Sequence, residues 1–140
     1  MILCPPVKQK RVKVGIVGYG YWGPKLARNF HELSESELVA ICDIKEDCLN
    51  PTKLPSKVPL VTQKFEDLLK SDLDAIAIAT PAITHFQLAK MALLSGKHIL
   101  IEKPIATTSQ EAQELIYLAN SQNLVLMVGH TFEYDPAIKV

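Results

Sequence analysis

The feature that most restricts the fold of this chain is the glycine pattern Gly18-Tyr19-Gly20-Tyr21-Trp22-Gly23. It directly follows residues 12–17, a β-branched run typical of a buried strand, and directly precedes a segment with helical spacing of apolar residues. Gly18 permits a tight turn, Gly20 lets an anion approach the main chain, and Gly23 lets the helix pack closely on the strand. The free N–H groups of the first helical turn then face the anion. This context predicts the diphosphate site of a dinucleotide, and the alternative is a glycine-rich turn without a ligand.

Strands and helices alternate along the rest of the chain. The predicted strands are near-continuous apolar runs at residues 12–17, 38–43, 58–61, 74–79, 98–101 and 124–128. The predicted helices cover residues 24–33, 65–69, 84–95 and 108–120. Pro51, Pro55 and Pro59 exclude a long helix in the segment that begins at residue 44. Buried apolar strands that alternate with helices are typical of a parallel sheet covered on both faces. We therefore predict an α/β fold with a doubly wound, mainly parallel six-stranded sheet and helices on both faces.

Local signals mark the ends of two of these helices. Thr84 with Gln87, and Thr108 with Glu111, have the spacing of capping boxes. Gly96 stands where a helix that begins near Thr84 needs a residue in the left-handed conformation.

The length of 140 residues suits a single domain. We expect a flexible tail at residues 1–11, a dinucleotide-binding domain at residues 12–130, and the start of a truncated linker helix at residues 131–140. Lys plus Arg and Asp plus Glu each number 15, so the chain lacks the basic excess of a nucleic-acid binder. No apolar run approaches the roughly 20 residues that span a bilayer, so no membrane partner is expected.

The three cysteines, Cys4, Cys42 and Cys48, form no CxxC pair. An odd number of unpaired cysteines indicates reduced thiols in a cytoplasmic protein. A metal site would need close His or Cys partners, which the sequence lacks, so no metal ligands are predicted.

Asp43 ends the second predicted strand, 25 residues after Gly18. A carboxylate about 20 residues beyond the glycine turn accepts hydrogen bonds from a ribose diol in dinucleotide-binding domains, and it repels a 2′-phosphate. The position therefore favours NAD over NADP. The alternative is that Asp43 only caps the following helix.

Polar residues follow the later strands, at the edge of the sheet where ligands bind in doubly wound folds. Thr80 and Pro81 come after the fourth strand, Glu102 and Lys103 after the fifth, and His130 after the sixth. His85 is either a solvated residue of a first helical turn or a wall of the pocket. For Tyr21 and Trp22, hydrophobic cover of the sheet edge and direct contact with the dinucleotide remain equally open.

The whole pattern resembles the glucose–fructose oxidoreductase, inositol dehydrogenase and MocA family. The resemblance rests on the glycine loop continued by Pro24, on Ala79-Thr80-Pro81 with His85, on Glu102-Lys103-Pro104, and on Val128-Gly129-His130-Thr131-Phe132 with Asp135-Pro136. It extends over residues 12–140, with these elements in the right order. Glu102-Lys103-Pro104 is its most specific element, and the loop sequence is similar to that of members acting on nucleotide-linked sugars.

The resemblance implies an NAD(P)-dependent oxidoreductase that transfers a hydride between a nicotinamide and a secondary alcohol of a sugar, nucleotide-sugar or polyol. It implies that Lys103 is catalytic, lying between nicotinamide and substrate, and that Glu102 contacts the nicotinamide side. The implied cofactor contacts are Gly18, Tyr19, Gly20, Tyr21, Trp22, Gly23, Asp43, Thr80, Pro81, His85, Glu102 and Lys103. The peptide before Pro104 is expected to be cis.

Family members also carry a second domain, which completes the substrate pocket and forms the interface of their homo-oligomers. That domain is absent from these residues, so we expect the isolated chain to bind cofactor without full activity.

Three alternatives accompany this interpretation. Glu102 and Lys103 could form a surface salt bridge, which would contribute less than about 1 kcal/mol. The chain could be a non-catalytic module that senses a dinucleotide, an idea that a reading frame continuing for roughly 200 residues, the length of one further domain, would remove. A methyltransferase-like fold also has a glycine loop and a later acid, but it leaves Lys103 and Pro104 without a role.

Overall fold

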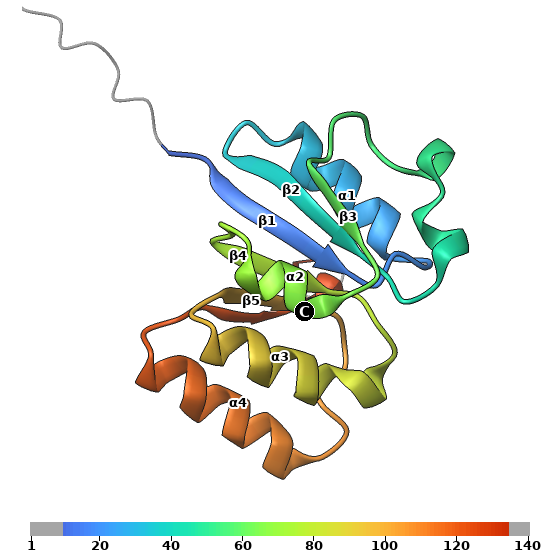
Figure 1. Ribbon diagram of the computed structural model, residues 1–140. Helices are drawn as coiled ribbons and strands as arrows, with labels where there is room; N and C mark the ends of the chain where they lie inside the picture. The colour runs from blue at the N-terminus through green and yellow to red at the C-terminus, as the bar shows by residue number, and fades with distance from the viewer. Residues whose placement is uncertain (1–9, 135–140) are drawn as a thin grey trace, which may run out of the picture.

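The computed structural model describes residues 10–134 (Figure 1). The predicted tail lies almost entirely outside this range. Of the linker helix predicted at residues 131–140, residues 131–134 form a 3₁₀ turn and the rest lie outside the described residues. The described strands are β1 (Val12–Val17), β2 (Ser36–Cys42), β3 (Leu60–Thr62), β4 (Ala75–Ile78), β5 (His98–Ile101) and β6 (Leu126–Val128). The helices are α1 (Gly23–Glu32), α2 (Phe65–Lys70), α3 (His85–Leu94) and α4 (Ser109–Ser121), with short 3₁₀ turns at Glu46–Leu49, Pro51–Lys53, Ala82–Thr84 and Thr131–Tyr134.

The six strands form one sheet in the order β3-β2-β1-β4-β5-β6, and every neighbouring pair is parallel. The chain moves outward from β1 to β3, crosses back over the sheet, and then moves outward from β4 to β6. The predicted doubly wound parallel sheet is therefore confirmed. The direction of winding reverses between β1 and β4, and the crevice at such a reversal is where doubly wound sheets bind ligands.

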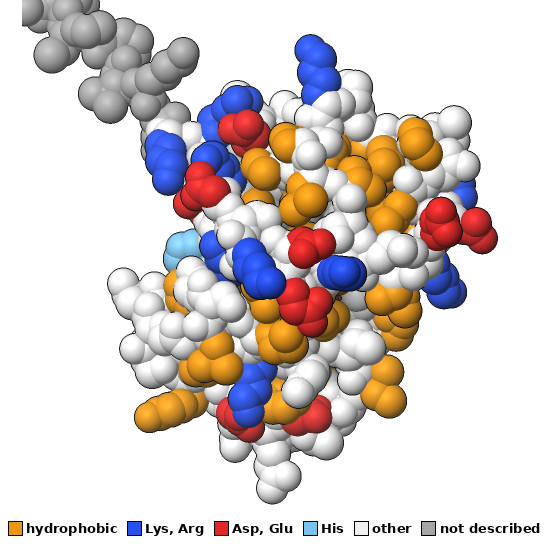
Figure 2. All heavy atoms as spheres, viewed as in Figure 1, with side chains coloured by type: hydrophobic (Ala, Val, Ile, Leu, Met, Phe, Trp, Pro, Cys, Tyr) orange, Lys and Arg blue, Asp and Glu red, His pale blue; other side chains and the backbone are white. Residues whose placement is uncertain are grey.

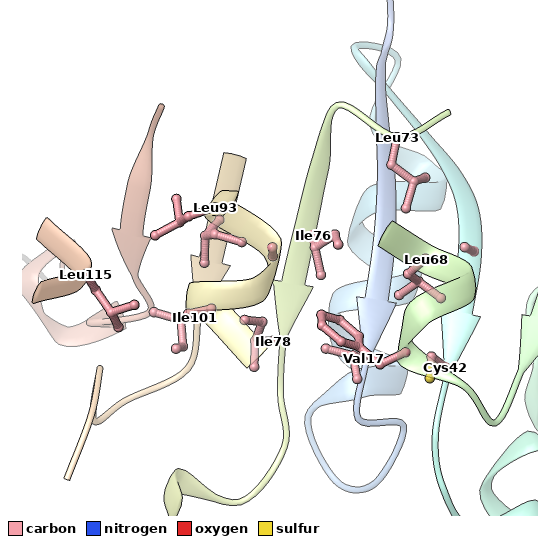
Figure 3. Close-up of a cluster of buried hydrophobic side chains, with 14 of the residues drawn as sticks. Val17, Cys42, Leu68, Leu73, Ile76, Ile78, Leu93, Ile101 and Leu115 are labelled. Carbon is pink, nitrogen blue, oxygen red and sulfur yellow. The ribbon is translucent and has the colours of Figure 1, made fainter. Parts of the chain in front are cut away.

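Side chains of the central strands point alternately to the two faces of the sheet and contribute to two hydrophobic cores, one on each face. On one face, α2, α3 and α4 bury Leu68, Leu93 and Leu115 against Val17 and Ile78 (Figure 3). Figure 1 shows α3 and α4 lying side by side on this face. On the other face, α1 packs over β1 and β2, with Ala27 and Ile16 fully buried. The helices thus cover both faces, as the apolar strand runs predicted.

One face of the sheet is incompletely covered. Beyond α1, above β4, β5 and β6, lies a shallow apolar hollow of about 300 Å³. Its lining includes Phe30, Leu33, Ala77, Leu100 and Met127. Leu33 directly follows α1 and is 52% exposed, although the helical spacing placed it on the buried side. The other surface shown in Figure 2 has positive and negative side chains interspersed, as the balanced composition suggests.

Two of the three predictions about helix ends are confirmed. Thr108 and Glu111 form the expected capping box at the start of α4, and Gly96, with φ +74°, follows the end of α3 as expected. The box predicted for Thr84 and Gln87 is wrong. The Thr84 hydroxyl instead donates to the carbonyl of Pro81 at 2.7 Å and lies 2.7 Å from the hydroxyl oxygen of Thr80, so the side chain is turned toward the preceding loop.

The proline-rich segment contains 3₁₀ turns in place of a long helix, as predicted, and β3 lies at one edge of the sheet. β6 is shorter than predicted, beginning at Leu126. No helix within residues 10–134 combines the length and the apolar character that crossing a membrane requires.

Candidate functional site

The glycine loop links β1 to α1 in the crevice between β1 and β4. Gly18 has φ +91°, and a Cβ there would lie 2.6 Å from the main-chain carbon and oxygen of Ala79. A Cβ at Gly23 would collide with the carbonyl oxygen of Gly18. Both glycines are therefore required by close main-chain packing, one against the end of β4 and the other within the loop. The positive φ of Gly18 agrees with the tight turn predicted there, whereas the close contact of Gly23 is with the loop itself and not with the strand.

Gly20 serves a different purpose from the other two glycines. A Cβ at this position would meet no described atom within 4 Å, so the space in front of it is open. Neither a packing contact nor a positive φ accounts for glycine here. Access to the main chain by a bound group is the remaining physical reason, as expected for a diphosphate.

Four consecutive main-chain N–H groups of this loop are free to bind an anion. The N–H groups of Gly20, Tyr21, Trp22 and Gly23 have no acceptor among the other described residues. They lie at the start of a ten-residue helix whose N-cap, Trp22, supplies no side-chain acceptor. Because the partial positive charge of a helix lies at this end, the loop fits the negatively charged diphosphate of a dinucleotide.

Asp43 follows β2 and faces the same loop. One carboxylate oxygen accepts the N–H of Tyr19 at 2.6 Å, and the other accepts the N–H of Lys45 at 2.8 Å. The N–H of Gly18 also donates to the carbonyl of Cys42 at 2.9 Å. Each carboxylate oxygen can accept a further hydrogen bond, so the group still fits a ribose hydroxyl. Asp43 therefore anchors the glycine loop, a role that the sequence did not predict.

The three aromatic residues of the loop face different surroundings. The ring of Tyr19 is 3% exposed in the core under α1, and its hydroxyl donates to the carbonyl of Lys53 at 3.2 Å. Tyr19 therefore approaches the site through its main chain, and the expectation of a cofactor contact does not extend to its ring. Tyr21 is 74% exposed, which argues against its being cover for the sheet.

Lys25 joins the two outer aromatic rings of the loop. Tyr21 and Trp22 meet edge to face with ring centres 5.4 Å apart. The Lys25 ammonium nitrogen lies 3.6 Å from the centre of the Tyr21 ring and 4.3 Å from that of Trp22. Lys25 also lowers the pKa of the Tyr21 phenol, first by hydrogen bonding and then by its charge. A positive charge therefore stands in the first turn of α1, beside the proposed anion site.

Glu102 and Lys103 directly follow β5. The N–H of Glu102 donates to the carbonyl of Ile78 at 2.9 Å, which fixes this strand end beside β4. The Glu102 carboxylate packs against Gly129, where a Cβ would lie 3.3 Å from its Oε1 atom. Within residues 10–134 neither Glu102 nor Lys103 forms an ion pair, so the surface salt bridge considered above is not formed. The peptide between Lys103 and Pro104 is cis, as expected.

His85 lies in neither of the predicted environments. It is the first residue of α3, and only 1% of its surface is exposed, so the interpretation as a solvated residue is wrong. Its Nδ1 atom lies 2.7 Å from the carbonyl oxygen of Pro104, and its Nε2 atom lies 2.8 Å from that of Thr80. Both ring nitrogens thus face protein carbonyls, which corrects the prediction that His85 lines the cofactor pocket. Thr80 and the exposed Pro81 remain at the strand end beside the glycine loop.

The acid–base properties of Cys42 reflect its burial. Burial, followed by the nearby carboxylates of Asp43, Asp67 and Glu66, raises the pKa of the thiol to about 12. A neutral thiol of this kind is a poor nucleophile and a poor metal ligand. In the part of the chain that the structure describes, no three His, Cys, Asp or Glu side chains come together as a metal site.

The sheet topology and an anion-binding helix terminus at its crevice define a dinucleotide-binding Rossmann domain. A family model described as an oxidoreductase family with an NAD-binding Rossmann fold matches residues 12–130. The chain therefore belongs to the family of glucose–fructose oxidoreductase, inositol dehydrogenase and MocA proteins.

Proteins similar to this chain are found both by sequence and by structure. A UDP-N-acetylglucosamine 3-dehydrogenase from Acidithiobacillus ferrooxidans is 32% identical over 128 residues, which are 91% of this chain and 40% of that protein. The apo scyllo-inositol dehydrogenase from Lactobacillus casei superposes with a TM-score of 0.84 at 30% identity, covering 92% of this chain and 39% of that one. A structure of the same enzyme with NAD(H) and scyllo-inositol gives a TM-score of 0.81 at 28% identity, covering 91% and 38%. The chain spans about 40% of the length of these relatives.

Proposed function

We propose that this chain is the cofactor-binding part of an oxidoreductase that transfers a hydride between NAD and a secondary alcohol of a sugar, nucleotide-linked sugar or polyol. The observation that carries the proposal is the run of four free N–H groups at Gly20–Gly23, beside open space and at the same edge of the sheet as the end of β5, which Lys103 follows. The relatives named above, a nucleotide-sugar dehydrogenase and an inositol dehydrogenase, support this substrate class.

The preference for NAD over NADP rests on Asp43. Its carboxylate retains acceptor capacity for the two hydroxyls of the adenine-side ribose, and its negative charge would repel a 2′-phosphate. Lys45, two residues further on, donates through its main chain to Asp43. That contact supports a fixed orientation of the carboxylate.

Lys103 is the proposed acid–base residue. Oxidation of an alcohol releases a hydride and a proton, and NAD supplies the hydride acceptor when bound. An amine beside the reacting carbon can orient the hydroxyl and exchange its proton. The freedom of Lys103 from any ion pair among residues 10–134 supports this role, because the group is not already committed to a carboxylate. Glu102, packed against Gly129, would border the nicotinamide.

Binding is tested by titrating the 140-residue chain with NADH, NADPH and ADP-ribose, using nicotinamide fluorescence and calorimetry. We expect saturable NADH binding, competition by ADP-ribose for the diphosphate site, and weaker binding of NADPH. A folded chain that binds none of the three would contradict the assignment.

Turnover is tested on the protein as its gene encodes it, with a panel of polyols and nucleotide-linked sugars. We expect NADH formation that is lost in Lys103→Met while NADH affinity is retained. Tight NADH binding without turnover on any alcohol would favour the dinucleotide-sensing module instead.

The cytoplasmic location inferred from the cysteines stays a prediction.

A further inference from the structure

A buried histidine joins the loops that follow β4 and β5. The His85 ring lies between two main-chain carbonyls that are 24 residues apart in sequence, those of Thr80 and Pro104. The nitrogen–oxygen distances of 2.8 Å and 2.7 Å are within hydrogen-bonding range, and the position of the ring protons decides which nitrogen donates. The ring therefore acts as a bridge across the edge of the sheet, at the point where Lys103 emerges from β5.

The segment that carries Lys103 has few other restraints. From residue 103 to residue 106, the contact between His85 and the Pro104 carbonyl is the one hydrogen bond to another described residue. Pro104 has no N–H, so its carbonyl is the only main-chain polar group through which it can be anchored. Ile105 and Ala106 pack against the protein, but apolar contacts do not fix an orientation as a hydrogen bond does.

From this geometry we propose that His85 is a positioning residue for Lys103. The ring holds the Pro104 carbonyl at a fixed place relative to the loop after β4, and so sets the direction in which the preceding lysine leaves the sheet. The importance of that direction for hydride transfer rests on the proposed function of Lys103. The bridge itself rests on the contacts of His85 alone.

The proposal requires the imidazole ring of His85 to carry a proton on a particular nitrogen. A neutral ring carries one N–H and one bare nitrogen, while the imidazolium carries two N–H groups. The Pro104 carbonyl can only accept, so the bridge to the lysine segment requires a proton on Nδ1. A histidine retained only for packing would have no such requirement.

The first measurement is the ¹⁵N spectrum of the histidine side chains in the wild-type 140-residue chain. We expect Nδ1 of His85 to carry a proton with a resolved one-bond coupling. A ring protonated on Nε2 alone would leave the Pro104 carbonyl without a donor, and would overturn the proposal whatever the chain binds.

The second measurement is ¹⁵N relaxation at the amides of Lys103 and Ile105 in variants of the same chain. In His85→Ala we expect the order parameters of these two amides to fall below about 0.6, the range of flexible backbone, since the hydrogen bond that restrains the segment is lost. His85→Gln should recover part of this order, because its amide can donate to the same carbonyl. Leu93→Ala is the matched control, since it empties a fully buried site in the same helix without touching the bridge.

The outcomes separate this proposal from the proposed function. Unchanged order parameters at Lys103 and Ile105 in His85→Ala, or an equal fall in Leu93→Ala, would overturn the positioning role even if NADH binds. Failure of the wild type to bind NADH, with the loss of order confined to His85→Ala, would overturn the cofactor assignment and leave the bridge intact. If His85→Ala does not fold, the proposal is tested by the ¹⁵N spectrum of the wild type and by the second measurement on His85→Gln.

Discussion

The main-chain N–H of Tyr19 donates to the carboxylate of Asp43 at 2.6 Å, so the residue after β2 holds the loop after β1. The same carboxylate also accepts the N–H of Lys45 at 2.8 Å. Asp43 thus restrains the loop that presents the free N–H groups of residues 20–23. The acid proposed for ribose recognition is also part of the frame of the diphosphate site.

Replacing Asp43 is therefore expected to affect binding in two ways. In Asp43→Ala, affinity for NADH should fall by about tenfold or more, because a charge-assisted contact worth roughly 1.5–3 kcal/mol is lost. Affinity for NADPH should fall less, since repulsion of the 2′-phosphate is also removed. Calorimetric titration of both cofactors checks this, with Asp47→Ala as a control in the neighbouring exposed turn. Equal losses for both cofactors would contradict the ribose assignment.

The two glycines at the start of the loop should respond differently to the same substitution. In Gly20→Ala the added methyl meets no described atom within 4 Å, so the melting temperature should stay within a few degrees while NADH affinity falls at least about tenfold. In Gly18→Ala the methyl meets the main chain of Ala79 at 2.6 Å with φ at +91°, and we expect destabilisation of about 2–5 kcal/mol. Thermal unfolding and NADH titration of both variants give the comparison.

That pair of variants also tests why Gly20 is a glycine. Full NADH affinity in Gly20→Ala would show that no ligand approaches the main chain there. Destabilisation of Gly20→Ala comparable to that of Gly18→Ala would show that the space in front of the loop is filled.

The two described cysteines should differ in reactivity. Burial raises the pKa of the Cys42 thiol to about 12, so its thiolate fraction at pH 8 is very small, and the side chain is 1% exposed. Cys48 is partly exposed. With a thiol reagent at pH 8, mass spectrometry should find Cys48 modified in the folded chain and Cys42 modified only after denaturation. Equal labelling of Cys42 and Cys48 before unfolding would contradict the burial of Cys42.

Asp74 is expected to contribute to stability in a pH-dependent way. The N–H of Lys13 donates to its carboxylate at 2.8 Å, and this hydrogen bond, aided by Lys10, lowers the pKa of Asp74. Because the carboxyl binds its proton more weakly in the folded state, the stabilisation is present above about pH 4 and is lost as the pH falls below that value. In Asp74→Asn, the free energy of unfolding should depend less on pH below about 4 than in the wild type. Urea titrations at several pH values measure this, and identical slopes would refute it.

The fold was predictable because its signals are local and repeated. Each parallel strand is a short apolar run, and the glycine pattern marks the turn at which the first strand meets its helix. The cap at Thr108 was equally local, and its box is formed. Each of these features depends on residues that are close together in the sequence, so a sequence pattern can express it.

The details that escaped prediction depend on contacts across the edge of the sheet. Thr84 had the spacing of a cap, but its hydroxyl bonds to the loop after β4. His85 is buried because the Pro104 carbonyl, 19 residues further on, faces its ring. The contact between Tyr19 and Asp43 likewise joins residues from two different strand ends. No local pattern shows which strand ends will meet, although the order of the strands makes such contacts a consequence of the topology.

The close approach of Gly18 to the main chain of Ala79 has a consequence for how the molecule assembles. The two residues are 61 positions apart, and they become neighbours only when the fourth strand docks beside the first. A partly folded chain that has formed only β1, the glycine loop and α1 therefore has the free N–H groups but lacks β4, which packs behind the loop. Binding of the proposed cofactor would thus require the complete central sheet. The nucleotide would therefore stabilise fully folded molecules relative to partly folded ones.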